Sequence, residues 1–190
     1  MVAASIFAVP AARALSVIPP TFQGLVSEAE TVIDGRVTGV RSDLEQYQGH
    51  SIVYTYVTIQ VLDTVKGQPG DTVELRILGG TVGDLTMEIP GVPKFKTGER
   101  DLFFIQGNGS AFCPLVAVPH GYYPITKRQS DGADVVLRSN GAPLEAPAEV
   151  AKELHGVAPN ERGQAAAGRA MTLSDFKKQI RTEVAHAREQ

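Results

Sequence analysis

The stretch SIVYTYVTIQVLDTV, residues 51–65, decides the fold class of this chain. Apolar and polar side chains alternate along it with a period of two, which is typical of a β-strand. One face carries Val53, Thr55, Val57, Ile59 and Val61, and the other carries Tyr54, Tyr56, Thr58 and Gln60. Since strands are commonly about 5–6 residues long, this stretch predicts a long, bent strand shared by the two sheets of a barrel.

Shorter stretches with strand character lie on both sides of this segment. They are residues 31–40, 72–78, 85–89, 101–105, 112–118, 122–126 and 134–137. Between them, the polar residues 41–49 predict a hairpin loop, and the glycine-rich residues 79–83 predict a flexible connector. Eight or nine short strands with turns at hairpin spacing favour a β-barrel or a β-sandwich.

Amphipathic stretches predict helices at both ends of the β region. The residues that share a helical face are Phe22, Leu25, Val26 and Ala29 in the first stretch, and Leu173, Phe176, Ile180 and Val184 in the last. Thr172 precedes the last stretch as an N-cap, with Asp175 at the third helical position. This C-terminal helix docks either on its own barrel or on a partner, and the sequence leaves both possibilities open.

The composition changes after Asn140 and indicates the domain organisation. Residues 141–171 are rich in Ala, Pro and Gly and predict a linker, mobile from 157 onward, with one short helix at 147–155. We therefore expect a β-barrel domain at 20–140, this linker and a C-terminal helix at 172–190.

The first fourteen residues, MVAASIFAVPAARA, resemble an export signal. A short apolar run is followed by Ala12-Arg13-Ala14, the pattern of a cleavage site, although no Lys or Arg precedes the run. The segment predicts an extracytoplasmic protein, periplasmic or secreted, cleaved before Leu15. The alternative is the frayed, Ala-rich terminus of a cytosolic protein.

The composition of the 190-residue chain excludes several classes of function. The net charge of −3 provides no basic excess to neutralise a nucleic-acid backbone, so no nucleic-acid partner is expected. A single cysteine excludes an internal disulfide and a zinc site built from cysteines. No segment is apolar for the ~20 residues that a membrane span needs, and no motif indicates a cofactor or a metal.

Four segments together carry a resemblance to known proteins. They are AETVIDGRV at 29–37, VYTYVTIQV at 53–61, VKG at 65–67 and GERDLFF at 98–104. In this order they resemble a group of uncharacterised exported bacterial proteins and, more distantly, the inhibitory domain of tissue inhibitors of metalloproteinases. The resemblance covers residues 22 to about 127. It implies an oligonucleotide/oligosaccharide-binding (OB)-type Greek-key barrel and a protein-binding role, so we predict a mainly β, OB-like barrel with short flanking helices and a C-terminal amphipathic helix.

The chain departs from these inhibitors at the residue that carries their mechanism. They place an N-terminal cysteine on the zinc of the protease and brace the domain with disulfides. The only cysteine here is Cys113, deep in the sequence among apolar neighbours, where it is either a buried small hydrophobic residue or a link to a second chain. The zinc-binding mechanism therefore does not carry over, and no functional residue transfers by motif.

The candidate binding residues are Tyr54, Tyr56, His120 and Tyr122. Tyr54 and Tyr56 share a strand face, and exposed tyrosines are favoured at recognition surfaces; buried, they are core residues with satisfied hydroxyls. We expect the contact surface to combine this face with the loops at 41–49 and 79–83. His120 precedes Gly121-Tyr122-Tyr123 at a predicted strand junction, where it is either exposed or a core histidine.

Three functions are compatible with these patterns. The preferred one is a non-enzymatic, exported barrel that binds another macromolecule, for instance an exported protease. The second is a hydrolase centred on His120, for which no nucleophile motif is present and no catalytic residue is assigned. The third is an envelope-associated structural module that uses its C-terminal helix to contact a partner.

Overall fold

The computed structural model describes residues 18–47, 49–156 and 163–187, so the predicted export signal at 1–14 lies outside the described residues. The fold is mainly β with short flanking helices, as the sequence predicts. The strands are β1 (Thr31–Tyr47), β2 (His50–Lys66), β3 (Thr72–Leu78), β4 (Gly80–Val82), β5 (Leu85–Met87), β6 (Arg100–Ile105), β7 (Tyr122–Lys127) and β8 (Asp134–Val136). The helices are α1 (Phe22–Glu28), the 3₁₀ helices η1 (Val118–His120) and η2 (Pro147–Ala151), α2 (Gln164–Arg169) and α3 (Leu173–His186).

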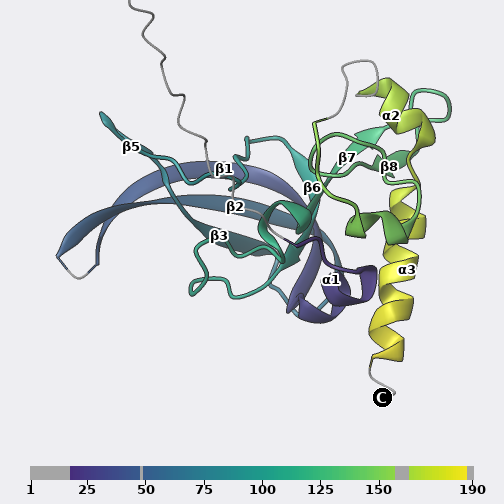
Figure 1. The fold of residues 1–190 in the computed structure, drawn as a ribbon, viewed down its shortest axis with the longest axis horizontal. Coiled ribbons are helices and arrows are strands. Elements are labelled where there is room, and N and C mark those ends of the chain that lie inside the picture. Colours follow the sequence, from purple (N-terminus) through teal and green to yellow (C-terminus); the bar gives the residue numbers. More distant parts are fainter. Residues whose placement is uncertain (1–17, 48, 157–162, 188–190) are drawn as a thin grey trace, which may run out of the picture.

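Six strands form one antiparallel sheet in the order β3-β2-β1-β6-β7-β8, and β4 pairs only with β5. The sheet is dominated by β1 and β2, which Figure 1 shows as a long, curved ribbon reaching away from the helices. Register shifts at Asp34/Gly35 and Val37/Gly39 mark irregular pairing in β1, and bulges of this kind bend a strand and increase its twist. The prediction of a long strand at 51–65 is confirmed by β2.

The prediction of a closed barrel is wrong. Strands β3 and β8 form the two ends of the sheet and do not pair with each other. Helix α3 packs against β2 and β8, and α1 packs against α3. In a barrel, this apolar face of the sheet would be buried against further strands. Here the helices cover it, so its burial does not require the sheet to close.

Two local predictions are also corrected. Residues 41–47 continue β1 up to the pair Tyr47↔His50 instead of forming a loop, because polar side chains suit a ribbon with one face in solvent. Residues 112–118 are not a strand and make one isolated bridge, Ile105↔Leu115. Ala117 and Val118 adopt positive φ values of 48° and 50° there, a conformation outside the β region.

Strand β6 separates two hydrophobic cores. Leu102 and Phe104 pack into the core beneath the helices, and Phe103 and Ile105 pack into a second core on the concave side of the β1–β2 ribbon. Successive strand residues point to opposite faces, so a strand covered on both faces is apolar throughout. This double burial explains the apolar run at 102–105.

Helix α3 begins where its capping residues predict. The Thr172 hydroxyl accepts a hydrogen bond of 3.1 Å from the Asp175 N–H, which satisfies a free donor of the first turn. Phe176 and Ile180 are fully buried in the helical core. The helix therefore docks its apolar stripe on its own chain.

The region that the sequence predicts as a linker contains two short helices, η2 near its start and the Ala-rich α2 near its end. Residues 157–162 of it lie outside the described residues. Among the helices described, none combines the length and hydrophobicity that crossing a membrane requires.

Candidate functional site

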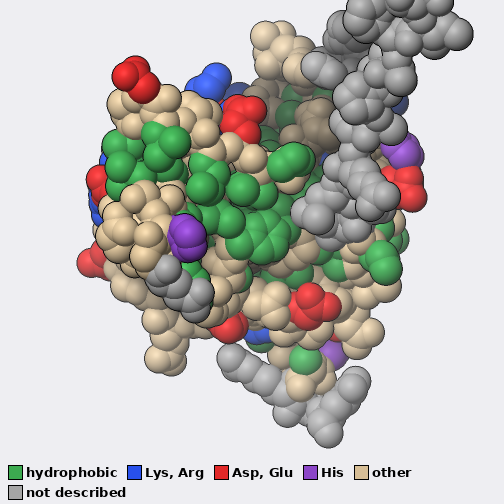
Figure 2. Space-filling view, turned by 60° about the vertical axis from the view of Figure 1, so that its left-hand side comes forward, with side chains coloured by type: hydrophobic (Ala, Val, Ile, Leu, Met, Phe, Trp, Pro, Cys, Tyr) green, Lys and Arg blue, Asp and Glu red, His purple; other side chains and the backbone are tan. Residues whose placement is uncertain are grey.

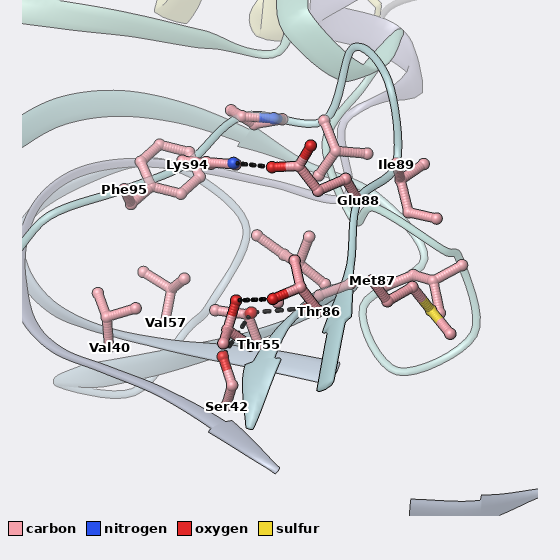
Figure 3. Close-up of a pocket in the computed structure, with 17 residues that line it drawn as sticks. Val40, Ser42, Thr55, Val57, Thr86, Met87, Glu88, Ile89, Lys94 and Phe95 are labelled. Atoms are coloured by element: carbon pink, nitrogen blue, oxygen red, sulfur yellow. Dashed lines mark hydrogen bonds and ion pairs between the residues drawn. The ribbon is translucent and has the colours of Figure 1, made fainter. Parts of the chain in front are cut away.

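A cleft lies between the concave side of the β1–β2 ribbon and the β4–β5 hairpin, with a cavity volume of about 240 Å³. We call it the β4–β5 cleft. Its floor comes from the ribbon through Val40, Ser42, Thr55 and Val57, and its other walls come from β3, the β4–β5 hairpin and the segment 88–95. Figure 3 shows the floor residues facing Thr86, Met87, Ile89 and Phe95 across the cleft.

The β4–β5 hairpin crosses the ribbon because Gly80 permits an unusually close approach. A Cβ atom at Gly80 would lie 2.3 Å from Thr55 Oγ1 and 2.6 Å from Ser42 Oγ, and its φ of +136° is one that other residues rarely adopt. Thr55 donates a hydrogen bond of 2.7 Å to the Gly79 carbonyl. Ser42 Oγ lies 2.9 Å from Thr55 Oγ1 and, because the Thr55 proton is engaged, donates this bond. The two hydroxyls thereby fasten the hairpin to the ribbon.

The cleft is lined mainly by aliphatic and aromatic side chains, with one ion pair at its rim. Lys94 Nζ lies 2.7 Å from a Glu88 carboxylate oxygen, and both side chains are largely exposed. Hydrogen bonding to Lys94 lowers the pKa of Glu88. Since an exposed pair of this kind contributes about 0–1 kcal/mol, it closes the rim only weakly. The residues that line the cleft include no His, Cys or Asp.

An apolar strip and a strand edge extend the cleft. Val40, Leu44 and Leu85 are 40%, 46% and 45% exposed, respectively. Figure 2 shows hydrophobic side chains gathered on this face of the molecule. Strand β1 pairs with β6 only from Thr31 to Arg36, so within the described residues its edge from 38 to 47, opposite β2, has no partner strand. Such an edge presents unpaired backbone donors and acceptors.

The predicted residues Tyr54 and Tyr56 lie on the other face of the ribbon, away from the cleft. The Arg76 guanidinium lies 3.4 Å from the ring centroid of Tyr54, and that of Arg41 lies 4.0 Å from that of Tyr56. Glu45 accepts hydrogen bonds from Arg76 and from the Tyr56 hydroxyl. Both hydrogen bonds lower the pKa of Glu45, to about 2, and the bond from Arg76 makes the largest contribution. The two rings are therefore covered by arginines and anchored at the hydroxyl of Tyr56.

The predicted residues His120 and Tyr122 do not join the tyrosine face either. His120 is 5% exposed. Burial and then the charge of Arg138 lower its pKa, whereas a backbone hydrogen bond with Val150 raises it. The charged neighbour is thus a cation, whereas a hydrolytic histidine needs a carboxylate and a nucleophile. Tyr122 is partly buried against Phe95, with ring centroids 5.1 Å apart. The four predicted residues consequently form no common site.

Sequence reasoning missed the residues that build the cleft. The alternation along 51–65 places Thr55 and Val57 on one face, but nothing local shows that Gly79-Gly80 carries a hairpin across that face. The pair of glycines is the available signal, because adjacent glycines mark a close backbone approach as well as a turn. Residues 88–95 have no periodicity, and their packing depends on contacts distant in sequence.

No metal or thiol chemistry is assembled in the part of the chain that the structure describes. No three His, Cys, Asp or Glu side chains cluster there as metal ligands. Cys113 is buried, and burial raises the pKa of its thiol to about 12, which keeps it in the unreactive thiol form.

Comparisons with known proteins do not assign the chain to a protein family. No protein-family model matches the chain, and no curated protein matches it significantly in sequence. The functional argument therefore rests on the geometry of the fold.

Proposed function

We propose that this protein is a non-enzymatic binding module that holds an extended segment of a partner protein. An apolar side chain of the partner fills the β4–β5 cleft, and its backbone pairs with the free edge of β1. The observation that carries the proposal is the position of an apolar cleft beside an unpaired strand edge. In recognition by strand addition, main-chain hydrogen bonds give affinity and side-chain pockets give specificity.

The size of the cleft favours a side chain over a free small molecule. Its volume of about 240 Å³ is below the ~300–1,000 Å³ usual for small-molecule sites. A cavity of about 150 Å³ already holds one benzene molecule, so this cleft suits one large or two small apolar side chains. The exposed Val40, Leu44 and Leu85 extend the contact beyond it, and exposed apolar patches mark interaction sites.

The topology and the N-terminal sequence support the kind of partner. The order β6-β1-β2-β3 in the open sheet is compatible with a Greek key and supports the proposed relation to OB-type folds. The export signal expected at residues 1–14 supports an extracytoplasmic partner. The resemblance to metalloproteinase inhibitors directs the first search to exported proteases.

The proposal is tested by selecting random peptides on the immobilised protein and measuring their affinity for matched variants. Val40→Asp places a charge on the floor of the cleft, and Gln60→Asp places one at an exposed position on the opposite face of the sheet. We expect the selected peptides to share an apolar residue. Their affinity for Val40→Asp should be at least about tenfold weaker than for the parent, a loss of about 1.4 kcal/mol. They should bind Gln60→Asp as tightly as the parent. Peptides that bind both variants alike, or a folded protein that selects none, would overturn it.

A further inference from the structure

Asp101 of β6 is a buried carboxyl group without a polar partner on one of its oxygens. The residue is 4% exposed, and its Oδ2 atom has no hydrogen-bond partner among the described residues. Buried polar atoms are nearly always hydrogen-bonded, so an orphan of this kind calls for an explanation by a bound group or a water molecule. It lies on the concave side of the sheet, away from the face on which Arg100 pairs with Asp34.

A cleft of about 640 Å³ reaches this residue, and we call it the Asp101 cleft. Phe95, Glu99 and Tyr122 line it together with Asp101. Phe95 and Tyr122 meet edge to face at an interplanar angle of 73°. The buried Asp101 therefore lines a cleft that also has an aromatic wall and a second carboxylate.

The cations that line the Asp101 cleft are engaged elsewhere. Arg36 donates to the Gly98 carbonyl at 3.0 Å, Lys94 pairs with Glu88 at 2.7 Å, and Lys127 pairs with Asp134 at 2.7 Å. Arg100 pairs with Asp34 and Asp134, both at 2.8 Å. None of these pairs includes Asp101, so the negative charge of its ionised form is not compensated by the described residues.

The local electrostatics are correspondingly negative. Burial, and then the charge of Glu99, raise the pKa of Asp101 to about 7. Burial, followed by the charges of Asp101 and Glu99, raises the pKa of the neighbouring Tyr122 to about 12, so Tyr122 stays neutral. A cation that enters the cleft meets one buried carboxylate, a second carboxylate and two aromatic rings.

We propose that the Asp101 cleft binds an alkylammonium group, with the ammonium on Asp101 and the alkyl chain against Phe95 and Tyr122. An ammonium fits better than a guanidinium because it is a compact point charge, whereas a guanidinium prefers both oxygens of an open carboxylate. Aromatic faces add favourable cation–π contacts. The Asp101 cleft shares Lys94 and Phe95 with the β4–β5 cleft, but the proposal does not rest on the proposed function.

The test titrates n-butylammonium, with 1-butanol as the neutral analogue and butyrate as the anionic one, into the full chain observed by NMR. At about pH 8.5 we expect n-butylammonium to shift the signals of Phe95, Asp101 and Tyr122. At about pH 5.5, where the carboxyl takes up its proton, we expect affinity at least about tenfold weaker. The proposal is overturned if n-butylammonium binds equally at both pH values, if 1-butanol binds equally well, or if butyrate binds preferentially. It is also overturned if n-butylammonium does not bind to the folded protein, which would leave a water molecule on Asp101.

Matched variants complete the test. Asp101→Asn removes the charge at the cleft, and Asp84→Asn removes one from the exposed turn of the β4–β5 hairpin. We expect Asp101→Asn to lose n-butylammonium binding by at least about tenfold and Asp84→Asn to retain it; binding that survives Asp101→Asn contradicts the proposal. The pH comparison on the parent protein decides the question if Asp101→Asn does not fold. A peptide with one lysine is titrated in parallel, and tighter binding of this peptide than of the free amine identifies a partner's lysine as the source of the group.

Discussion

Lys177 of α3 donates a hydrogen bond of 2.5 Å to Asp34 of β1, a residue 143 positions earlier in the chain. Arg100 donates to the same carboxylate from β6, with two bonds of 2.8 Å. Asp34 is 1% exposed and the Lys177 side chain is 10% exposed. The last helix is thus joined to the first strand by a buried ion pair, in addition to the apolar contacts of Phe176 and Ile180.

Lys177→Met should destabilise the fold by about 2 kcal/mol, because it keeps the side-chain stem but leaves a buried carboxylate with one cation instead of two. Lys178→Met, at an exposed position on the same helix, should change stability by less than about 0.5 kcal/mol. The comparison is made by urea unfolding of the two variants. If both shift the midpoint alike, the buried pair contributes nothing specific.

Gly80→Ala should release the β4–β5 hairpin from the ribbon and cost about 2 kcal/mol, since its Cβ atom would clash with Thr55 Oγ1 in a backbone conformation unsuited to alanine. Gly83→Ala is the control, because its added Cβ atom meets nothing within 4 Å although its φ is +57°. Amide exchange of residues 81–87 should accelerate in the first variant much more than in the second. Equal acceleration would show that the close contact at Gly80 does not hold the hairpin.

Asp101→Asn should stabilise the protein at about pH 8.5 by about 2 kcal/mol or more, and this gain should shrink as the pH falls towards 4. The sign follows from the raised pKa of Asp101: the folded state takes up a proton near pH 7, so the carboxyl destabilises the fold only when it is ionised. His120 acts in the opposite direction, because its lowered pKa removes stability as the pH falls below its ordinary value. Parent and variant must therefore be compared at each pH by thermal unfolding. A difference that does not vary with pH would contradict the assignment.

Tyr54→Ala and Tyr56→Ala should leave peptide binding unchanged, although their shared strand face in the sequence favours a recognition surface. Their rings lie under Arg76 and Arg41 on the face opposite the cleft. Affinity for peptides selected on the parent protein provides the measurement. A loss of at least about tenfold in either variant would return the binding surface to the tyrosine face.

The sequence predicts the parts of this fold that depend on local patterns. The alternation in 51–65 identifies β2, and the threonine before Leu173 identifies the start of α3. The strand character of residues 101–105 identifies most of β6. Closure of the sheet is not local, since it depends on whether strands or helices cover the face of β6. The cleft is missed for the same reason: the role of Gly80 depends on Ser42 and Thr55, which approach it only in the folded chain.

Asp101 shows the same limit for a titratable group. In the sequence it lies in the turn-to-strand segment GERDLFF, where a carboxylate is expected in solvent. Only the pairing of β6 with β1 and β7 buries it while its neighbour Arg100 turns to Asp34 on the other face. An unpartnered buried group is visible only once all three strands are in place.

The most direct test of the proposed function is the amide exchange of β1, measured by NMR with and without a peptide selected on the protein. Strand addition beside the β4–β5 cleft predicts slower exchange within residues 38–47 and contacts between an apolar peptide side chain and Val40 or Val57. A bound peptide that leaves exchange along this edge unchanged, or that contacts the tyrosine face instead, would contradict the account.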